Sequence, residues 1–192
     1  MQCWNGFERP AKGHQLSCRR VTLSRARGQT FEVANRLQGQ GQPFAQVRGR
    51  CELGHGAEPH STQVPLLIDL AKKRGCATHA GPGENVWSNV HIDDLVALYV
   101  LAIESAPPGA FLFAENGENS MREVCEAINR MLGFTGPPVA MSMEQAASEW
   151  GEGTAEDTMA SNSRVRGTSA RQLGWKPKAR GLIEEIEQGC YR

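Results

Sequence analysis

The sequence predicts an α/β fold over residues 53–192. Three observations predict it: helical apolar patterns that begin at capping residues and stop at Gly or Pro, short apolar strands between these patterns, and an ordinary globular composition. The chain has 192 residues, of which 40% are hydrophobic and 22% charged, which suits one domain with a buried core. The alternation of strands and helices is typical of an α/β segment.

The first predicted helix begins after Ser61 or Thr62, either of which can cap it, and stops at Gly75. Strands are predicted at the start of 76–80 and over 87–92, with a Gly-Pro-Gly turn between them. A second helix follows at once. Asp93 and Asp94 are expected to cap it, and the Pro-Pro-Gly run at 107–109 ends it.

Residues 110–116, AFLFAEN, read as a short buried strand. Ser120 and Glu123 have the spacing of a capping box, which opens a helix that stops at Gly133. Ser142 is expected to cap the next helix. Two more helices are predicted, one ending before Gly174 and the last over 181–192.

Residues 1–52 differ from the rest of the chain. Apolar residues appear singly, without strand alternation or helical period, and LQGQGQPFAQ is rich in Gly and Gln. We therefore expect this segment to be poorly ordered. Residues 1–60 hold nine Lys/Arg against four Asp/Glu, but the arginines are scattered without aromatic interleaving, so no specific nucleic-acid binding is expected.

The six cysteines contain no C-x-x-C pair, which gives no sign of a zinc or redox motif, so no metal ligand is assigned. The N-terminus lacks the apolar run of a signal peptide, and no stretch approaches the roughly 18 apolar residues of a membrane span. A cytoplasmic protein with reduced thiols and no membrane contact is the expectation.

The run WSNVHIDDLVALYVLAIE at 87–104 resembles the strand and helix signature in the C-terminal half of the NAD-dependent epimerase/dehydratase family, the extended short-chain dehydrogenases/reductases. Further motifs occur in the family's order: GHG at 54–56, GPGEN at 81–85, FAEN at 113–116 and ARQLGWKPK at 170–178. The resemblance implies that 53–192 is the C-terminal substrate-binding portion of an extended Rossmann-type short-chain dehydrogenase. It also implies NAD or NADP as the parent family's cofactor and a small molecule as its substrate.

By the same resemblance, residues 85–91 line a substrate pocket, with Asn85, Trp87, Ser88 and His91 as the candidate substrate-binding residues. Each has a structural alternative. Trp87 is also compatible with a place in the core, and a histidine on an apolar strand is as often a satisfied core residue as a pocket group. Asp93 and Asp94 fit helix capping better than catalysis.

Three arginines of the C-terminal part, Arg164, Arg166 and Arg171, would suit an anionic substrate, although exposed arginines are more often simply solvated. One departure weakens the case for a nucleotide sugar. Family members that bind such sugars often have Arg-Asp before the Val-His-Val-Asp-Asp run, where this chain has Trp87 and Ser88.

Two family motifs are absent. No Gly-x-x-Gly-x-x-Gly turn follows an apolar strand, so cofactor binding by this chain is doubtful and no cofactor-binding residue is assigned. Neither Tyr99 nor Tyr191 has a lysine four residues on, so no catalytic residue is assigned.

The leading hypothesis is a partial epimerase/dehydratase-like oxidoreductase that cannot catalyse alone, which leaves open whether the chain is an enzyme. Under this hypothesis residues 1–52 do not belong to the family's sequence, and a truncated, frameshifted or misassigned reading frame would produce such a segment. The alternative is a non-catalytic interaction module that pairs with another subunit. Uncovered apolar surface of a half-domain would then drive self-association into a homo-oligomer.

Overall fold

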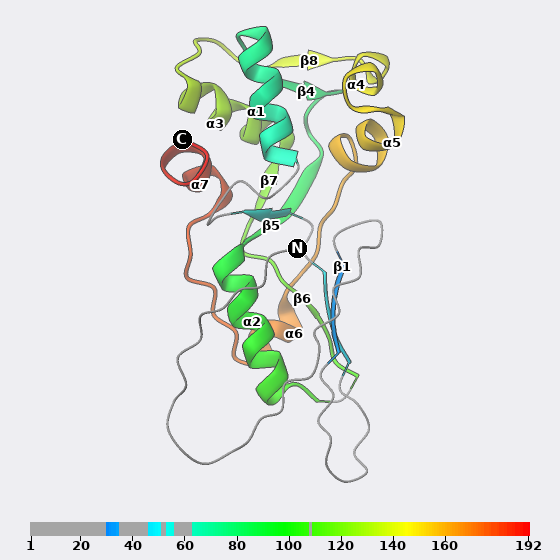
Figure 1. Cartoon of the computed structure of the whole chain (residues 1–192), viewed down its shortest axis with the longest axis vertical. Helices are drawn as coiled ribbons and strands as arrows, with labels where there is room; N and C mark the ends of the chain where they lie inside the picture. The colour runs from blue at the N-terminus through cyan, green and yellow to red at the C-terminus, as the bar shows by residue number, and fades with distance from the viewer. Residues whose placement is uncertain (1–29, 35–45, 51–52, 56–62, 108) are drawn as a thin grey trace, which may run out of the picture.

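The computed structural model describes residues 30–34, 46–50, 53–55, 63–107 and 109–192. Within these ranges the chain is α/β, with short strands in three small sheets and helices packed on them (Figure 1). The sheets have the strand orders β1-β2-β6, β3-β5-β7 and β4-β8. The strands are β1 (Thr30–Ala34), β2 (Gln46–Arg50), β3 (Leu53–His55), β4 (Thr78–Ala80), β5 (Val86–His91), β6 (Phe111–Phe113), β7 (Glu118–Ser120) and β8 (Val139–Met141).

The helices are α1 (Gln63–Arg74), α2 (Ile92–Ser105), α3 (Met121–Leu132), α4 (Met143–Trp150), α5 (Glu152–Thr154), a π-helical turn η1 (Ala155–Met159), α6 (Thr168–Gln172) and α7 (Leu182–Gln188). The predicted helices occur in the predicted order, and two short elements that were not predicted, α5 and η1, follow α4. The end of α1 is as predicted, since Gly75 adopts φ 71° and glycine takes this left-handed conformation without steric cost. Its proposed caps, Ser61 and Thr62, lie outside the described residues.

Local signals place α3 and α4 correctly. Ser120 accepts a hydrogen bond from the Glu123 backbone N–H, and the Glu123 side chain accepts one from the Ser120 backbone N–H. Ser142 and Gln145 form the same reciprocal box at α4. The predicted capping box and capping serine are therefore confirmed.

The start of α2 differs from the prediction. His91 is its N-cap, because the His91 ring accepts a hydrogen bond from the backbone N–H of Asp93 through Nδ1 at 3.2 Å. Asp93 and Asp94 lie in the first turn instead, where negative side chains interact favourably with the positive end of the helix dipole. The capping position was wrong by two residues because a histidine ring supplied the acceptor.

The apolar core has two parts that meet at β5. The first cluster packs α1, α3, α7 and β4 around residues such as Leu67, Ile128 and Ile186, and includes Trp87 of β5. The second packs α2 against β6 and α6, and includes Val90 of β5. In Figure 1, α1, α3 and β4 lie above β5 and α7 lies beside it, whereas α2, β6 and α6 lie below it. This strand thus connects both halves of the core.

Two strands, β1 and β2, lie inside the N-terminal segment that was expected to be poorly ordered, and they pair antiparallel with Val33 opposite Val47. The rest of 1–52 lies outside the described residues, so its order and its division from 53–192 stay predictions. In the portion of the chain that is described, none of the helices has the length and apolar character that crossing a membrane requires.

Candidate functional site

Three of the four predicted substrate-binding residues, Asn85, Trp87 and Ser88, contact an extended segment, residues 161–167, which we call the strap. The strap runs beside β5 and makes an isolated parallel bridge between Trp87 and Ser163. The backbone N–H of Ser88 donates to the Ser163 carbonyl at 2.9 Å, and that of Ser163 donates to the Val86 carbonyl at 3.0 Å. On the other side of β5, β7 pairs antiparallel with residues 86–88. The site is thus a strand held between β7 and the strap.

Asn85 and Trp87 fix the beginning of the strap. The Asn85 side-chain amide donates to the carbonyls of Met159 and Ser161 at 3.0 and 3.1 Å. The Trp87 indole N–H donates to the same Ser161 carbonyl at 2.9 Å, while its ring belongs to the first core cluster. Both side chains therefore donate hydrogen bonds to backbone carbonyls at the point where the chain continues from the π-helical turn into the strap.

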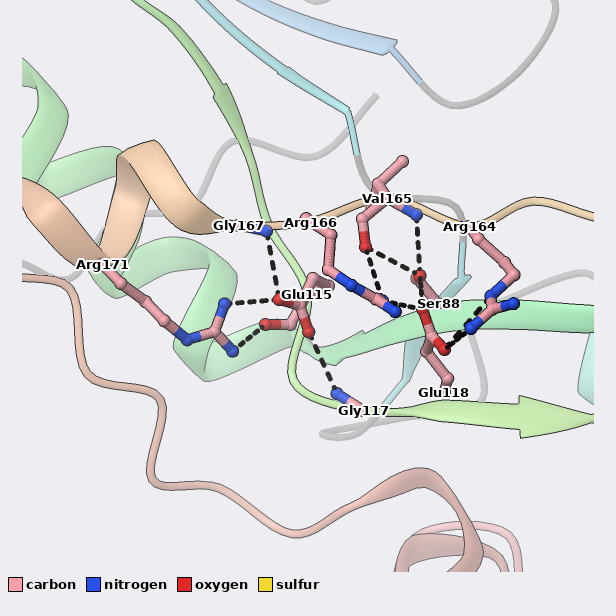
Figure 2. A network of polar contacts seen from close by, with 9 residues as sticks. All are labelled: Ser88, Glu115, Gly117, Glu118, Arg164, Val165, Arg166, Gly167 and Arg171. Atoms are coloured by element: carbon pink, nitrogen blue, oxygen red, sulfur yellow. Dashed lines mark hydrogen bonds and ion pairs between the residues drawn. The ribbon is translucent and has the colours of Figure 1, made fainter.

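Ser88 fixes the middle of the strap (Figure 2). Its hydroxyl oxygen accepts a hydrogen bond from the Val165 backbone N–H at 2.9 Å, and the residue is 1% exposed. The same hydroxyl lies 3.2 Å from the Val165 carbonyl and 3.4 Å from Oε1 of Glu118. Because a hydroxyl has one proton, it donates to one of these acceptors at a time.

His91 lies away from the strap, at the end of β5. With Nδ1 accepting from Asp93, a neutral ring carries its proton on Nε2, which lies 3.9 Å from Oε2 of Glu185 on α7. Both side chains are buried, 8% and 5% exposed by residue. His91 thus caps α2 and faces Glu185 of the C-terminal helix.

Charged side chains gather where the strap passes β7. Arg164 donates through Nη2 and Nε to Oε2 of Glu118 at 2.7 and 3.2 Å, and Arg166 donates through Nη1 to Oε1 (Figure 2). The Arg164 and Arg166 guanidiniums lower the pKa of Glu118 to about 2. The Glu118 carboxylate is therefore ionised at any physiological pH.

A second ion pair closes the end of the strap. Glu115 accepts hydrogen bonds from the Arg171 guanidinium and, at 3.1 Å, from the backbone N–H of Gly167. Burial opposes ionisation of Glu115, but the hydrogen bonds from Arg171 and Gly167 outweigh it and the pKa of Glu115 lies below its ordinary value. A Cβ at Gly167 would lie 2.8 Å from the Arg171 guanidinium and 3.1 Å from the Phe113 carbonyl, so a larger residue there would displace the Arg171 side chain.

Asp94 makes the connection between the family-like run and the C-terminus. Its carboxylate is 6% exposed and accepts the backbone N–H groups of Lys178 and Ala179 at 2.8 and 3.0 Å. Its backbone carbonyl accepts the Trp175 indole N–H at 2.8 Å. Asp94 is thus a buried structural acceptor that holds the chain between α6 and α7.

A shallow groove of about 390 Å³ lies between α1 and α4. Its walls come from those two helices, and none of the four candidate residues lines it; the lining residues are Leu66, Asp69, Leu70, Lys72, Lys73, Glu149 and Trp150. An ion pair between Lys73 and Glu149 at 3.5 Å joins the two walls. The groove and the strap are separate features.

Comparison with known proteins places the fold. No family model matches the chain. It is 30% identical over 138 residues to an uncharacterized protein of Schizosaccharomyces pombe. The aligned region covers 71% of this chain and 45% of that protein. A second uncharacterized protein, from Saccharomyces cerevisiae, is 30% identical over 125 residues, or 64% of this chain and 41% of that one. The chain spans a little under half the length of these curated relatives.

Among solved structures, dTDP-glucose 4,6-dehydratase from Bacillus anthracis in complex with NAD matches 75% of this chain and 42% of its own, with a TM-score of 0.54 at 20% identity. The UDP-glucose 4-epimerase of Thermotoga maritima with UDP-glucose matches 76% and 44%, with a TM-score of 0.55 at 18% identity. The chain has the fold of part of an NAD-dependent epimerase/dehydratase. The predicted resemblance and the Rossmann-type α/β fold class are therefore confirmed.

The structure brings three of the four predicted residues, Asn85, Trp87 and Ser88, onto the strap, and leaves His91 apart from it. Whether the four bind substrate stays a prediction. Glu118 was missed by sequence reasoning, because a single Glu at the start of the three-residue strand β7 carries no pattern. The spacing of Arg164 and Arg166 was the available signal, since residues i and i+2 of an extended segment lie on one side.

Proposed function

We propose that this chain is the substrate-binding part of an NAD(P)-dependent epimerase/dehydratase-like oxidoreductase and that it does not catalyse hydride transfer alone. The observation that carries the proposal is the fold, which corresponds to 42–44% of two enzymes whose solved structures hold NAD or UDP-glucose. The lack of a glycine-rich phosphate turn and of Tyr-x-x-x-Lys in the sequence supports the second clause.

In this proposal β5 and the strap form the floor of a pocket for a small molecule. The fixed positions of Asn85, Trp87 and Ser88 support it, because a rigid, hydrogen-bonded floor orients a ligand without an ordering cost. NAD or NADP would be held by the parent family's other half. We also place the protein in the cytoplasm, where its scattered cysteines stay reduced.

Two titrations test the clauses separately. Calorimetry with NAD⁺ and with NADP⁺ should give no binding heat, and a micromolar Kd for either nucleotide would refute the second clause. NMR titration with UDP-glucose should move the Trp87 indole N–H resonance and the amides of β5 and the strap. Resonances that stay unmoved in β5 and the strap while others shift would place the ligand elsewhere and refute the first clause.

A second function, a non-catalytic interaction module, is favoured by the outer face of α2. Val96, Val100 and Ile103 lie four and three residues apart on this helix and are 51%, 51% and 44% exposed. This spacing forms an apolar stripe of the kind that packs against another helix. The module would pair with another subunit through this stripe, or with a second copy of the chain.

Light scattering tests the module. It predicts that the wild-type chain self-associates and that Val96→Gln with Val100→Gln shifts it toward monomer. Val139→Gln is the matched control, because Val139 is also 51% exposed but lies on β8. A well-dispersed wild-type monomer that also fails to bind any partner subunit would count against the module.

A further inference from the structure

The strap presents two guanidinium groups at one place. Arg164 and Arg166 are separated by one residue on an extended segment, so both side chains leave the strap on the same side. Both end on the carboxylate of Glu118, with Arg164 on Oε2 and Arg166 on Oε1. The side chains of the two arginines remain 53% and 62% exposed, whereas Glu118 is 19% exposed.

The charges here do not balance. Arg164 and Arg166 both pair with Glu118, whereas Arg171 alone matches Glu115 (Figure 2). Glu118 therefore faces two cations alone and neutralises one of them. Among the described side chains of this network, one unit of positive charge is left over, and it lies on the two exposed arginines.

Hydrogen-bond donors are also left over. A guanidinium has five N–H donors in a planar fork that matches carboxylate and phosphate oxygens. In the contacts that the described residues make, Arg164 uses Nε and Nη2, which leaves Nη1. Arg166 uses Nη1 for both Glu118 and the Val165 carbonyl, which leaves Nε and Nη2.

We propose that Arg164 and Arg166 bind an oxyanion, either a phosphate or a carboxylate group of a ligand, and that Glu118 is the internal anion that holds the two guanidiniums together until the ligand arrives. The strap is fixed by Ser88 and Trp87, so the arginines are positioned before binding. This inference rests on the proposed function for the role of the site, since it names the chemical class of the ligand that the substrate-binding part takes.

The internal carboxylate has a measurable consequence. Glu118 repels an incoming anion and competes with it for the same donors. Neutralising Glu118 while keeping its shape should therefore strengthen anion binding, as expected for charges a few ångströms apart near a protein surface. If the arginines were only structural, the same change would weaken the strap and create no site.

The test follows the arginine Nε–H and strap amide resonances by NMR while inorganic phosphate, malonate or chloride is added. We expect phosphate or malonate to shift these resonances, with an affinity about fivefold to tenfold higher in Glu118→Gln. Arg164→Gln with Arg166→Gln should lower it at least tenfold. Phosphate without malonate would identify a phosphoryl ligand, and malonate without phosphate a carboxylate.

The matched controls use the ion pair between Arg130 on α3 and Glu187 on α7, whose Nε and Oε1 atoms are 2.6 Å apart. Their side chains are 55% and 28% exposed. Arg130→Gln and Glu187→Gln should leave anion binding unchanged. Unchanged spectra outside the strap and β7 establish that each variant is folded. Binding that is the same in Glu118→Gln as in wild type, or that survives in the double arginine variant, overturns the proposal.

Titration with UDP-glucose separates this inference from the proposed function. If the Trp87 indole resonance responds equally in wild type and in the double arginine variant, the pocket proposal holds and the arginine site fails. If phosphate or malonate shifts the arginine resonances while UDP-glucose leaves the Trp87 indole resonance and the amides of β5 unmoved, the arginine site holds and the pocket proposal loses its support.

Discussion

Asp94→Ala is expected to destabilise the protein strongly, while Asp93→Ala, one residue earlier, is not. The Asp94 carboxylate is buried and accepts two backbone N–H groups 84 and 85 residues away, at 2.8 and 3.0 Å. Asp93 is 78% exposed at its side chain and contributes mainly through the helix dipole. The pair is a matched comparison of one carboxylate in two environments.

The magnitude follows from the hydrogen bonds. A hydrogen bond to a charged group is worth roughly 1.5–3 kcal/mol, and a donor left without a partner costs about 1–3 kcal/mol. Removing the Asp94 carboxylate frees two half-buried N–H groups that water can partly reach, so we expect a loss of about 3 kcal/mol. For a domain of this size that lowers Tm by roughly 10 °C. Asp93→Ala should cost about 0.5 kcal/mol, the usual size of a dipole interaction.

Urea unfolding followed by circular dichroism and by tryptophan fluorescence measures both variants. Trp175 is 3% exposed and its indole N–H donates to the Asp94 backbone carbonyl. Because loss of the Asp94 carboxylate loosens this segment, the fluorescence maximum of Trp175 should shift to longer wavelength. Asp94→Asn should fall between wild type and Asp94→Ala, since an amide keeps one acceptor. Equal effects of the two alanine variants would refute the assignment of Asp94 as the buried acceptor.

Three further outcomes are expected. Gly83→Ala should lower the free energy of unfolding by about 2–3 kcal/mol, because φ is 71° and the new Cβ would lie 2.7–2.9 Å from the His79 ring. Gly81→Ala is the control: φ is 58° but the space around the new Cβ is open, so it should cost about 1 kcal/mol. Equal costs in thermal unfolding would contradict the clash with His79. The depressed pKa of Glu118, about 2 against 4.5, predicts that its ion pairs stabilise the fold above about pH 4.5 and lose that contribution as the pH falls toward 2; wild type and Glu118→Gln should converge in stability over that range, and a constant difference would argue against it. Burial raises the pKa of Cys125 to about 12, so iodoacetamide at pH 8 should leave it unmodified until the protein is unfolded, as peptide mass spectrometry would show.

Much of the fold was predictable because its signals are local. The Ser120 and Glu123 capping box, the Ser142 cap and the glycine stop at Gly75 act within one helical turn, so the sequence pattern contains all the interacting groups. The strands β7 and β8 were not predicted. Each has three residues, and each depends on a partner strand far along the chain, β5 or β4.

The candidate site divides in the same way. Sequence motifs pointed to Asn85, Trp87 and Ser88, but their hydrogen-bond partners lie 74 to 77 residues later, so the strap that they hold could not be read from the run itself. A long separation in sequence also hid the contact between Glu118 and Arg164, because Arg164 follows Glu118 by 46 residues.

The sequence by itself determined the α/β order, most helix ends and the family resemblance, because capping, apolar periodicity and glycine turns act between neighbours. The tertiary structure alone decided what each polar side chain does. Asp94 is buried beneath the C-terminal segment and Asp93 is exposed, although they are adjacent and identical. The difference arises because burial and hydrogen bonding depend on chain segments that meet only after folding.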